Sequence, residues 1–417
     1  MVIFIFGCSL NKLSEQEGSK VESQETGNTE EIDTSIEDQP LYPDPAALPV
    51  QTTPPAALIS FEGEEISTPE QWWVSRQPEI LRLFSYYAYG YNPPRQEALF
   101  IRTAQYDHVF GELGEMEEFN FYYSSERSAR VLLVRPAGVI NAPLVLGLNK
   151  CGNSSIIEDS RVSLANLWFN PQCTTGESGR GTRASYWDIR QLLEAGFAVA
   201  TVAYGDLAPD VNGELNWGVL GELDWDDIDE DAPWGGIGAW AFGLSEISRH
   251  LASSGLIDRN QIILFGHSRR GKAALWAATQ NTEIAGVWAH QSGKLGASLT
   301  RSFEGEPLRS VTTVFSHWFT PRLSEFVGEE TRMPFDQHLL LASLAPRPVL
   351  ISDGDADTWA DPAGAAQAVD LAKPVYEFLG ADPSRIQQRI RSGGHSVTSE
   401  DWSLFLSFAG QQGWGLY

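Results

Sequence analysis

One serine of the chain lies in a glycine-flanked turn between a predicted strand and a predicted helix. Ser268 belongs to the sequence Gly-His-Ser-Arg-Arg-Gly-Lys at 266–272, which follows the apolar run 261–265 and precedes the helix-forming run 273–278. This order is typical of a nucleophile elbow, which exposes a serine hydroxyl on a tight turn. A serine that only caps the helix would give the same local pattern. A serine reacts when a base takes its proton, so the catalytic interpretation also requires a histidine and an acid.

A histidine and several carboxylates follow the serine in the expected order. His395 lies in a glycine-rich turn between the last predicted strand and the last predicted helix, where its imidazole could reach Ser268. We expect the acid in the loop after the strand at 349–352, where Asp357 is our choice and Asp355 is the alternative. This acid needs only to accept a hydrogen bond from the imidazole and to stabilise the imidazolium.

Two cations next to the serine indicate the kind of substrate. Arg269 occupies the position whose backbone N–H ordinarily contacts the oxyanion, and its guanidinium could add a charged donor. A surface ion pair is the alternative role for Arg269. Lys272 lies one turn further along the same face, and the two cations favour a polar, acidic-sugar substrate over a lipid tail. Strand alternation turns His267 away from Ser268, so we expect His267 to be structural.

Apolar strand segments alternate with helices through most of the chain, which indicates a mostly parallel sheet covered on both faces. The sequence therefore predicts an α/β protein with the α/β-hydrolase fold, a three-layer sandwich around a mostly parallel central sheet. Two long segments, 153–182 and 210–234, are expected to be inserted loops, and the acidic run 224–231 could wall the site or form a solvated face. The predicted strands are 129–134, 144–148, 198–202, 262–265, 286–290, 349–352 and 388–391, and the predicted helices are 71–87, 185–195, 237–251, 272–279 and 398–409.

The first 57 residues differ in composition from the rest of the chain. A short apolar run ends in Gly7-Cys8, which resembles the lipobox of bacterial lipoproteins, and an acidic, proline-rich segment follows it. Such a segment buries too little apolar surface to fold. We expect a lipoprotein-like signal remnant and disordered tether in 1–57, with a candidate lipid anchor at Cys8, and a catalytic domain in 58–417. The protein would be secreted, or an outer-membrane or periplasmic lipoprotein of a bacterium; a fragment of an ordinary export signal is the alternative.

Charge and cysteine usage exclude some classes of partner. The net charge of −26 argues against a protein that binds nucleic acid, because such proteins need a basic face. Cys8, Cys151 and Cys173 form neither a disulfide framework nor a metal-ligand spacing, although Cys151 and Cys173 could pair. Hydrolysis by serine, histidine and aspartate requires no metal or organic cofactor, so we expect none, and we expect a monomer.

The elbow and several distant segments together resemble the glucuronoyl esterases of carbohydrate esterase family 15. The elbow of that family reads Gly-Cys-Ser-Arg-x-Gly-Lys, and here His267 stands in place of the cysteine. The resemblance extends from about Trp72 to the end of the chain. The other matching segments are 148–153, 204–206, 208–210, 238–243, 305–306, 317–319, 394–395 and 401–402.

The resemblance implies a role for each candidate residue. It implies that Ser268 is the nucleophile, that His395 is the base, and that Arg269 stabilises the oxyanion. The family also binds the hydroxyl groups of the uronate through a lysine, a glutamate and a tryptophan. The residues in this chain that match those positions are Lys272, Glu306 and Trp359.

One departure from the family concerns the acid. Many members take it from the glutamate of a Glu-Ser-Gly segment, which here reads Gln-Ser-Gly from Gln291. An amide cannot replace the charge of a carboxylate, so the acid must come from the later loop, which supports Asp357. The family cleaves esters between 4-O-methyl-glucuronic acid on xylan and lignin alcohols, which implies a uronate-bearing polysaccharide or lignin-carbohydrate ester as substrate. The alternatives are an acetyl xylan esterase-like enzyme and an inactive, surface carbohydrate-binding homologue.

Overall fold

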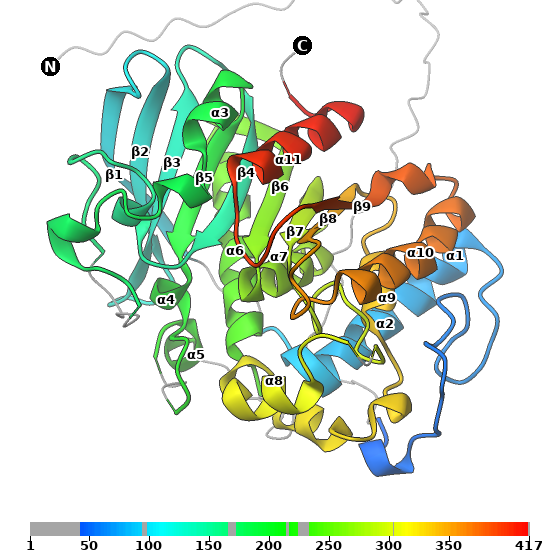
Figure 1. Cartoon of the computed structure of the whole chain (residues 1–417). Helices are drawn as coiled ribbons and strands as arrows, with labels where there is room; N and C mark the ends of the chain where they lie inside the picture. The colour runs from blue at the N-terminus through cyan, green and yellow to red at the C-terminus, as the bar shows by residue number, and fades with distance from the viewer. Residues whose placement is uncertain are drawn as a thin grey trace, which may run out of the picture. The chain divides into compact units, whose positions relative to one another are not determined.

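The computed structural model describes residues 42–93, 98–165, 172–213, 217–223, 233–302 and 304–415. Cys8 and the acidic run 224–231 lie outside these residues. Among the described residues, nine strands form one sheet in the order β1-β2-β3-β5-β4-β6-β7-β8-β9 (Figure 1). The strands are β1 Leu99–Val109, β2 Gly114–Tyr122, β3 Ser128–Pro136, β4 Ala142–Asn149, β5 Ala198–Ala203, β6 Ile257–His267, β7 Gly286–His290, β8 Val349–Gly354 and β9 Ile386–Arg391.

The sheet is parallel over its larger part. The pairs β4–β5, β4–β6, β6–β7, β7–β8 and β8–β9 are parallel, whereas β1–β2, β2–β3 and β3–β5 are antiparallel. The helices are α1 Pro69–Gln71, α2 Gln77–Phe84, α3 Ile189–Glu194, α4 Tyr204–Leu207, α5 Val219–Glu222, α6 Gly236–Ser253, α7 Arg269–Gln280, α8 Leu308–Val314, α9 Gln337–Ala342, α10 Pro362–Phe378 and α11 Ser399–Gln411. The predicted α/β-hydrolase fold is confirmed, and each predicted strand lies within an observed one. The hairpin of β1 and β2 is an addition that the sequence did not indicate.

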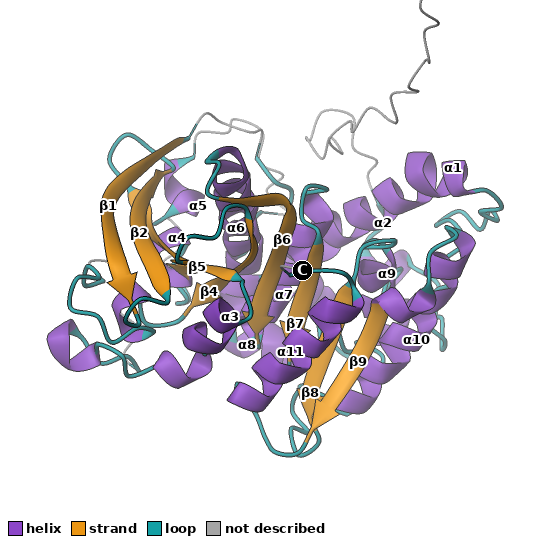
Figure 2. Cartoon of the chain, turned by 90° about the horizontal axis from the view of Figure 1, so that it is seen from above, coloured by secondary structure: helices purple, strands orange, loops and turns teal. Residues whose placement is uncertain are grey.

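Neighbouring residues of the central strands pack on opposite faces of the sheet, because side chains alternate along a strand. Ile262 and Leu264 belong to a core cluster shared with α6 and α7, whereas Ile263 and Phe265 belong to a second cluster shared with α3 and α11. Figure 2 shows α3 and α11 on one side of the sheet and α6 on the other. The central strands are therefore apolar on both faces, as a covered parallel sheet requires.

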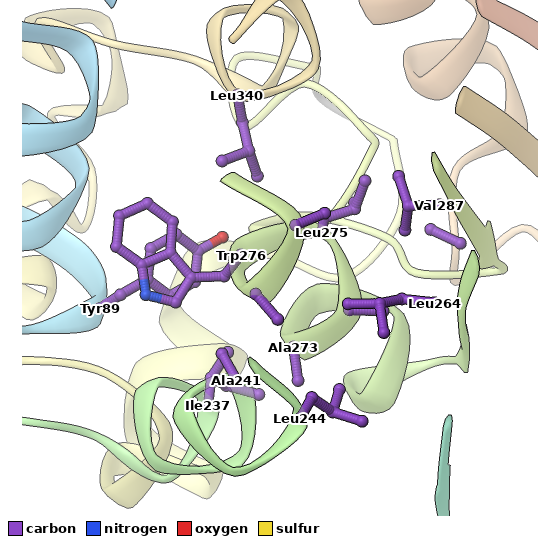
Figure 3. Close-up of a cluster of buried hydrophobic side chains, with 14 of the residues drawn as sticks. Tyr89, Ile237, Ala241, Leu244, Leu264, Ala273, Leu275, Trp276, Val287 and Leu340 are labelled. Atoms are coloured by element: carbon purple, nitrogen blue, oxygen red, sulfur yellow. The ribbon is translucent and has the colours of Figure 1, made fainter. Parts of the chain in front are cut away.

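Helix α7 is fixed from several directions within the first of these clusters. The ring of Trp276 is fully buried and stacks on Tyr89, with ring centres 4.6 Å apart. Figure 3 shows side chains of α7 meeting those of α6 on one side and Leu264 and Val287 of β6 and β7 on another. Burial of each large apolar side chain contributes about 1.5–3 kcal/mol to the stability of the fold. The helix that follows Ser268 is therefore firmly fixed against the core.

The predicted helix at 71–87 is observed as one helical run that includes two wider π-turn segments, Trp72–Arg76 and Ser85–Tyr89. The chain also packs before this helix. Tyr42 and Leu48 are buried in the core, and the hydroxyl of Tyr86 donates to the carbonyl oxygen of Tyr42 at 3.2 Å. Residues 42–57, which our boundary assigns to the tether, thus contact the catalytic domain, because the Tyr42 ring finds aromatic neighbours there.

Cys151 and Cys173 form a disulfide, which answers the question that their spacing left open. Their Cα atoms are 5.4 Å apart, and the bond joins the segment after β4 to a point 22 residues further along. Within the described ranges, none of the helices combines the length and the apolar character needed to cross a membrane.

Candidate active site

Ser268 occupies the tight turn between β6 and α7. Its φ of 61° lies in the left-handed region, which a serine adopts only when its surroundings impose it. Two glycines make this turn feasible, because a Cβ at Gly266 would collide with the carbonyl oxygen of Arg270 and one at Gly271 with that of Gly266. The N–H of Gly271 closes the turn by donating to the carbonyl oxygen of Ser268 at 2.8 Å. The strand and the helix therefore meet closely around the serine.

His395 and Asp357 are in direct contact. Nδ1 of His395 and Oδ2 of Asp357 are 2.6 Å apart, and the Asp357 side chain is 3% exposed against 38% for His395. Asp357 follows β8, and its N–H donates to the carbonyl oxygen of Gly354 at 3.0 Å. Asp355, the alternative acid, instead accepts from the N–H of Gly393 at 2.8 Å. A carboxylate at Nδ1 orients the imidazole so that Nε2 is free to accept a proton.

Gln291 supports the backbone of the turn that carries His395. Its Oε1 accepts from the N–H of Ser396 at 2.9 Å, and its Nε2 donates to the carbonyl oxygen of Gly394 at 2.8 Å. Gln291 follows β7 and is only 1% exposed. The sequence identified Gln291 only as a missing acid, whereas the structure gives its amide these contacts on both sides of His395.

His267 lies in the site, so our expectation that its side chain faces away is wrong. Its ring centre is 4.5 Å from that of His395, and its Nε2 is 3.1 Å from Oε1 of Gln291. Burial lowers the pKa of His267 well below its usual value, and the neighbouring His290 and Arg270 lower it further, so this imidazole is neutral. The alternation of side chains fails as a guide here because the chain leaves the strand at Ser268.

Arg269 is held by a buried carboxylate. Its guanidinium pairs with Oδ2 of Asp210 and lies over the rings of Phe315 and Trp318, 5.0 and 4.3 Å from their centres. Oδ1 of Asp210 accepts from Nε2 of His317 at 2.9 Å and from Nε1 of Trp318 at 2.7 Å. Burial raises the pKa of Asp210, but the bond from His317, the charge of Arg269 and the bond from Trp318 outweigh it and hold this pKa well below its usual range. Arg269 therefore has one charged, fixed partner.

Lys272, Glu306 and Trp359 lie together on the β7 and β8 side of the elbow. Nζ of Lys272 donates to the carbonyl oxygen of Ser292 at 2.7 Å and to that of Lys294. Burial lowers the pKa of Lys272 to about 8, against the opposing effect of the Glu306 charge. The N–H of Glu306 donates to the carbonyl oxygen of Trp359 at 3.0 Å, and the Trp359 side chain is exposed. The buried lysine and glutamate therefore lie close to the segment that carries the exposed Trp359.

A cavity of about 230 Å³ adjoins both Ser268 and His395. Its wall combines aromatic rings with four cationic side chains. Lys272, Glu306 and Trp359, hereafter the Lys272 group, do not line it. Among the described residues, no three or more His, Cys, Asp or Glu side chains gather in a way that could hold a metal ion. The lining residues are Leu148, Asn149, Lys150, Ile156, Arg183, Tyr186, Trp187, Tyr204, Phe265, His267, Ser268, Arg269, Arg270, His395 and Val397.

Comparison with known sequences points to one family. A family model described as fungal glucuronyl esterase matches residues 161–380. Carbohydrate esterase MZ0003, from an unknown prokaryotic organism, is 33% identical over 393 residues, which cover 88% of this chain and 90% of that protein. A 4-O-methyl-glucuronoyl methylesterase 1 of Phanerochaete chrysosporium is 32% identical over 168 residues, or 38% of this chain and 35% of that protein.

Solved structures agree with the sequence matches. A glucuronoyl esterase from Solibacter usitatus superposes with a TM-score of 0.82 at 30% identity, covering 88% of this chain and 99% of that chain. A promiscuous CE15 esterase from a marine bacterial metagenome superposes with a TM-score of 0.79 at 32% identity, covering 88% of this chain and 98% of that chain. The likeness therefore extends over nearly the whole of both solved chains.

Proposed function

The chain belongs to the glucuronoyl esterases of carbohydrate esterase family 15 and is a carboxylic ester hydrolase, and we propose that it cleaves esters of (4-O-methyl-)glucuronic acid through an acyl-enzyme. The contact of Asp357 with His395, whose ring lines the same cavity as Ser268, carries this proposal. Relatives named 4-O-methyl-glucuronoyl methylesterases support the uronate ester as substrate. The ester bonds between lignin alcohols and glucuronoxylan are the proposed natural targets.

In the first half of the reaction, Oγ of Ser268 attacks the ester carbonyl carbon while Nε2 of His395 takes the serine proton. Asp357 keeps the Nδ1 proton in place and stabilises the imidazolium. The tetrahedral intermediate collapses as its C–O bond to the alcohol breaks, and His395 returns the proton to the departing oxygen. The uronoyl group is then esterified to Ser268.

In the second half, a water molecule replaces the alcohol. His395 takes a proton from this water, the resulting hydroxyl attacks the acyl carbon, and the bond to Oγ of Ser268 breaks as Oγ regains a proton. The uronic acid leaves as the free acid and ionises. Negative charge develops on the carbonyl oxygen in both halves, and the fixed guanidinium of Arg269 stabilises that charge.

The acyl half of the substrate is assigned to Lys272, Glu306 and Trp359. Two of the three N–H groups of the Lys272 ammonium bond to backbone carbonyls, which leaves one for a sugar hydroxyl. Glu306 provides an acceptor beside it, and the exposed ring of Trp359 can cover an apolar face of the sugar. This arrangement suits a hydroxylated uronate better than a simple acetyl group.

The proposal is tested by measuring hydrolysis of the benzyl ester of glucuronic acid by the full chain and by Ser268→Ala. We expect the variant to lose at least about a thousandfold in kcat, because no other side chain replaces the nucleophile. Circular dichroism of both proteins controls for folding. No hydrolysis by the folded parent, with release of acetate from acetylated xylan instead, would replace this function with that of an acetyl xylan esterase.

We also propose that the enzyme acts outside the cytoplasm, anchored to lipid through Cys8. The Cys151–Cys173 disulfide supports export, because such bonds persist mainly in oxidising compartments. The apolar run before Cys8 and the acidic segment after it support an anchor with a tether. Metabolic labelling with palmitate tests the anchor: the label should enter the full chain and be absent from Cys8→Ala.

A further inference from the structure

The cavity beside Ser268 holds more positive charge than the oxyanion requires. Lys150, Arg183, Arg269 and Arg270 all line it. Arg269 is paired with Asp210. Over the parts of the chain that the structure describes, the other three cations form no ion pair with a carboxylate.

The contacts of these three cations are with neutral groups. Nζ of Lys150 donates to the side-chain oxygen of Gln172, and a guanidinium nitrogen of Arg183 donates to the main-chain oxygen of Gln172 at 3.4 Å. Nη2 of Arg270 lies 3.2 Å from Nδ1 of His267, which is neutral. Neutral partners satisfy donors but leave the charges in place.

The mutual repulsion of these charges is visible at Lys150. Burial and the charges of Arg270, Arg269 and Arg183 together lower its pKa to about 8, against the opposing effect of the Asp210 charge. Burial also lowers the pKa of Arg270. An anion placed among these groups would raise the pKa of Lys150 and of Arg270 again. It would also be attracted to the cations more strongly than in water.

The cationic cavity lies on the opposite side of the elbow from the Lys272 group. Lys150 follows β4, and the guanidinium of Arg270 lies 5.9 Å from the ring centre of Tyr204, which follows β5. The Lys272 group contacts the segments that follow β7 and β8. In the sheet order β5-β4-β6-β7-β8, these two groups flank β6 and its serine. If the acyl half occupies the β7 side, the β4 side is left for the alcohol half.

We propose that this cavity binds an anionic group, a carboxylate or a sulfate, on the alcohol half of the ester. This inference rests on the proposed function, and it makes an acidic carbohydrate or another anionic alcohol the preferred leaving group. The net charge of −26 would by itself repel such a substrate. A preference for the anionic ester would therefore have to come from the local cations.

The test compares kcat/KM for three benzyl esters of glucuronic acid at pH 7, where Lys150 is charged. Two carry a carboxylate or a sulfonate in the para position of the benzyl ring, and the third carries a neutral carboxamide of similar size. We expect at least one anionic ester to be preferred about tenfold, a ratio typical of a charged hydrogen bond, and the better anion distinguishes carboxylate from sulfate recognition. Lys150→Gln and Arg183→Gln should each lower this ratio, and the double variant should bring it to about one or below.

Arg259→Gln serves as the matched control, because it removes an exposed positive charge at the start of β6 and should keep the ratio. The ratio is taken within one preparation, so partial unfolding lowers all three rates and leaves it unchanged. A ratio of one or less in the parent, or a ratio that Lys150→Gln and Arg183→Gln leave intact, would overturn the inference while the esterase function stands. Failure to hydrolyse any of the three esters would instead overturn the proposed function, and the inference with it.

Discussion

Two positions at the carboxyl ends of neighbouring strands contact the turn of His395 in different ways. Asp357, after β8, meets the ring at Nδ1 with a carboxylate, 2.6 Å away. Gln291, after β7, meets the backbone on both sides of the ring with an amide. The comparison teaches that charge and position come from separate residues: Asp357 places a carboxylate at the ring, where we propose that it stabilises the imidazolium, and Gln291 holds the segment from which the imidazole extends.

An amide suits the second task better than a carboxylate does. The carbonyl oxygen of Gly394 needs a donor, which the Nε2 of Gln291 provides and a carboxylate oxygen cannot. The position is almost fully buried, so a charge there would lose its hydration, and within the described part of the chain the hydrogen-bond partners of Gln291 include no cation. Gln291 is therefore suited to holding the turn of His395 in position.

The largest effect is expected where the comparison assigns the charge. Asp357→Asn should lower kcat by about a thousandfold or more, because an amide neither stabilises the imidazolium nor fixes the correct tautomer. Hydrolysis of benzyl glucuronate measures it, with thermal unfolding as the control for stability. A loss smaller than tenfold would mean that another carboxylate carries the charge.

An intermediate effect is expected from charging the other position. Gln291→Glu should lower kcat about tenfold, because the new oxygen repels the carbonyl oxygen of Gly394 and shifts the turn of His395. On the acid side of the pH profile, the pH at which the rate falls to half should rise, since a nearby carboxylate favours the imidazolium of His395. A merely structural role for Gln291 would change stability without moving this pH.

The double variant sharpens the comparison further. If residue 291 only holds the turn in place, the double variant Asp357→Asn with Gln291→Glu should have a kcat less than about threefold above that of Asp357→Asn alone. Recovery to within about tenfold of the parent would show that a carboxylate after β7 can replace the one after β8, and the separation of tasks would fail.

The smallest effect is expected at the alternative acid. Asp355 bonds to the N–H of Gly393 and not to the imidazole, so Asp355→Asn should change kcat by about twofold, because its amide oxygen can still accept that bond. The same assay and the midpoint of thermal unfolding measure it. A loss comparable to that of Asp357→Asn would return Asp355 to the position of catalytic acid.

The parallel strands and the elbow could be predicted because their information is local. Buried strands are continuous apolar runs, and Gly266 and Gly271 mark the close approach of strand and helix. β1 escaped prediction since most of its residues are exposed, which leaves no apolar pattern to detect. The contact of Asp357 with His395 could be anticipated because Gln291 removed the competing position for a carboxylate, and the catalytic role of Asp357 stays a prediction.

The remainder of the site depends on contacts between distant residues. Asp210 and Arg269 are 59 positions apart, and Gln291 and Gly394 are 103 apart, so no local spacing records either pair. The matching segment at 208–210 was a usable signal for Asp210, although it did not reveal the partner. For His267 the error was different. The alternation of side chains along a strand was applied to Ser268, where the strand has already ended.

The Cys151–Cys173 disulfide is directly connected to the cationic cavity. Lys150 precedes Cys151, and Gln172, which holds both Lys150 and Arg183, precedes Cys173. One side of the cationic cavity is thus made from the immediate neighbours of the crosslink, while Ser268, His395 and Asp357 lie on other segments. If the cationic cavity selects the alcohol as proposed, an enzyme matured in a reducing cell would still cleave esters but would discriminate less between alcohols, and two preparations of identical sequence would differ in selectivity.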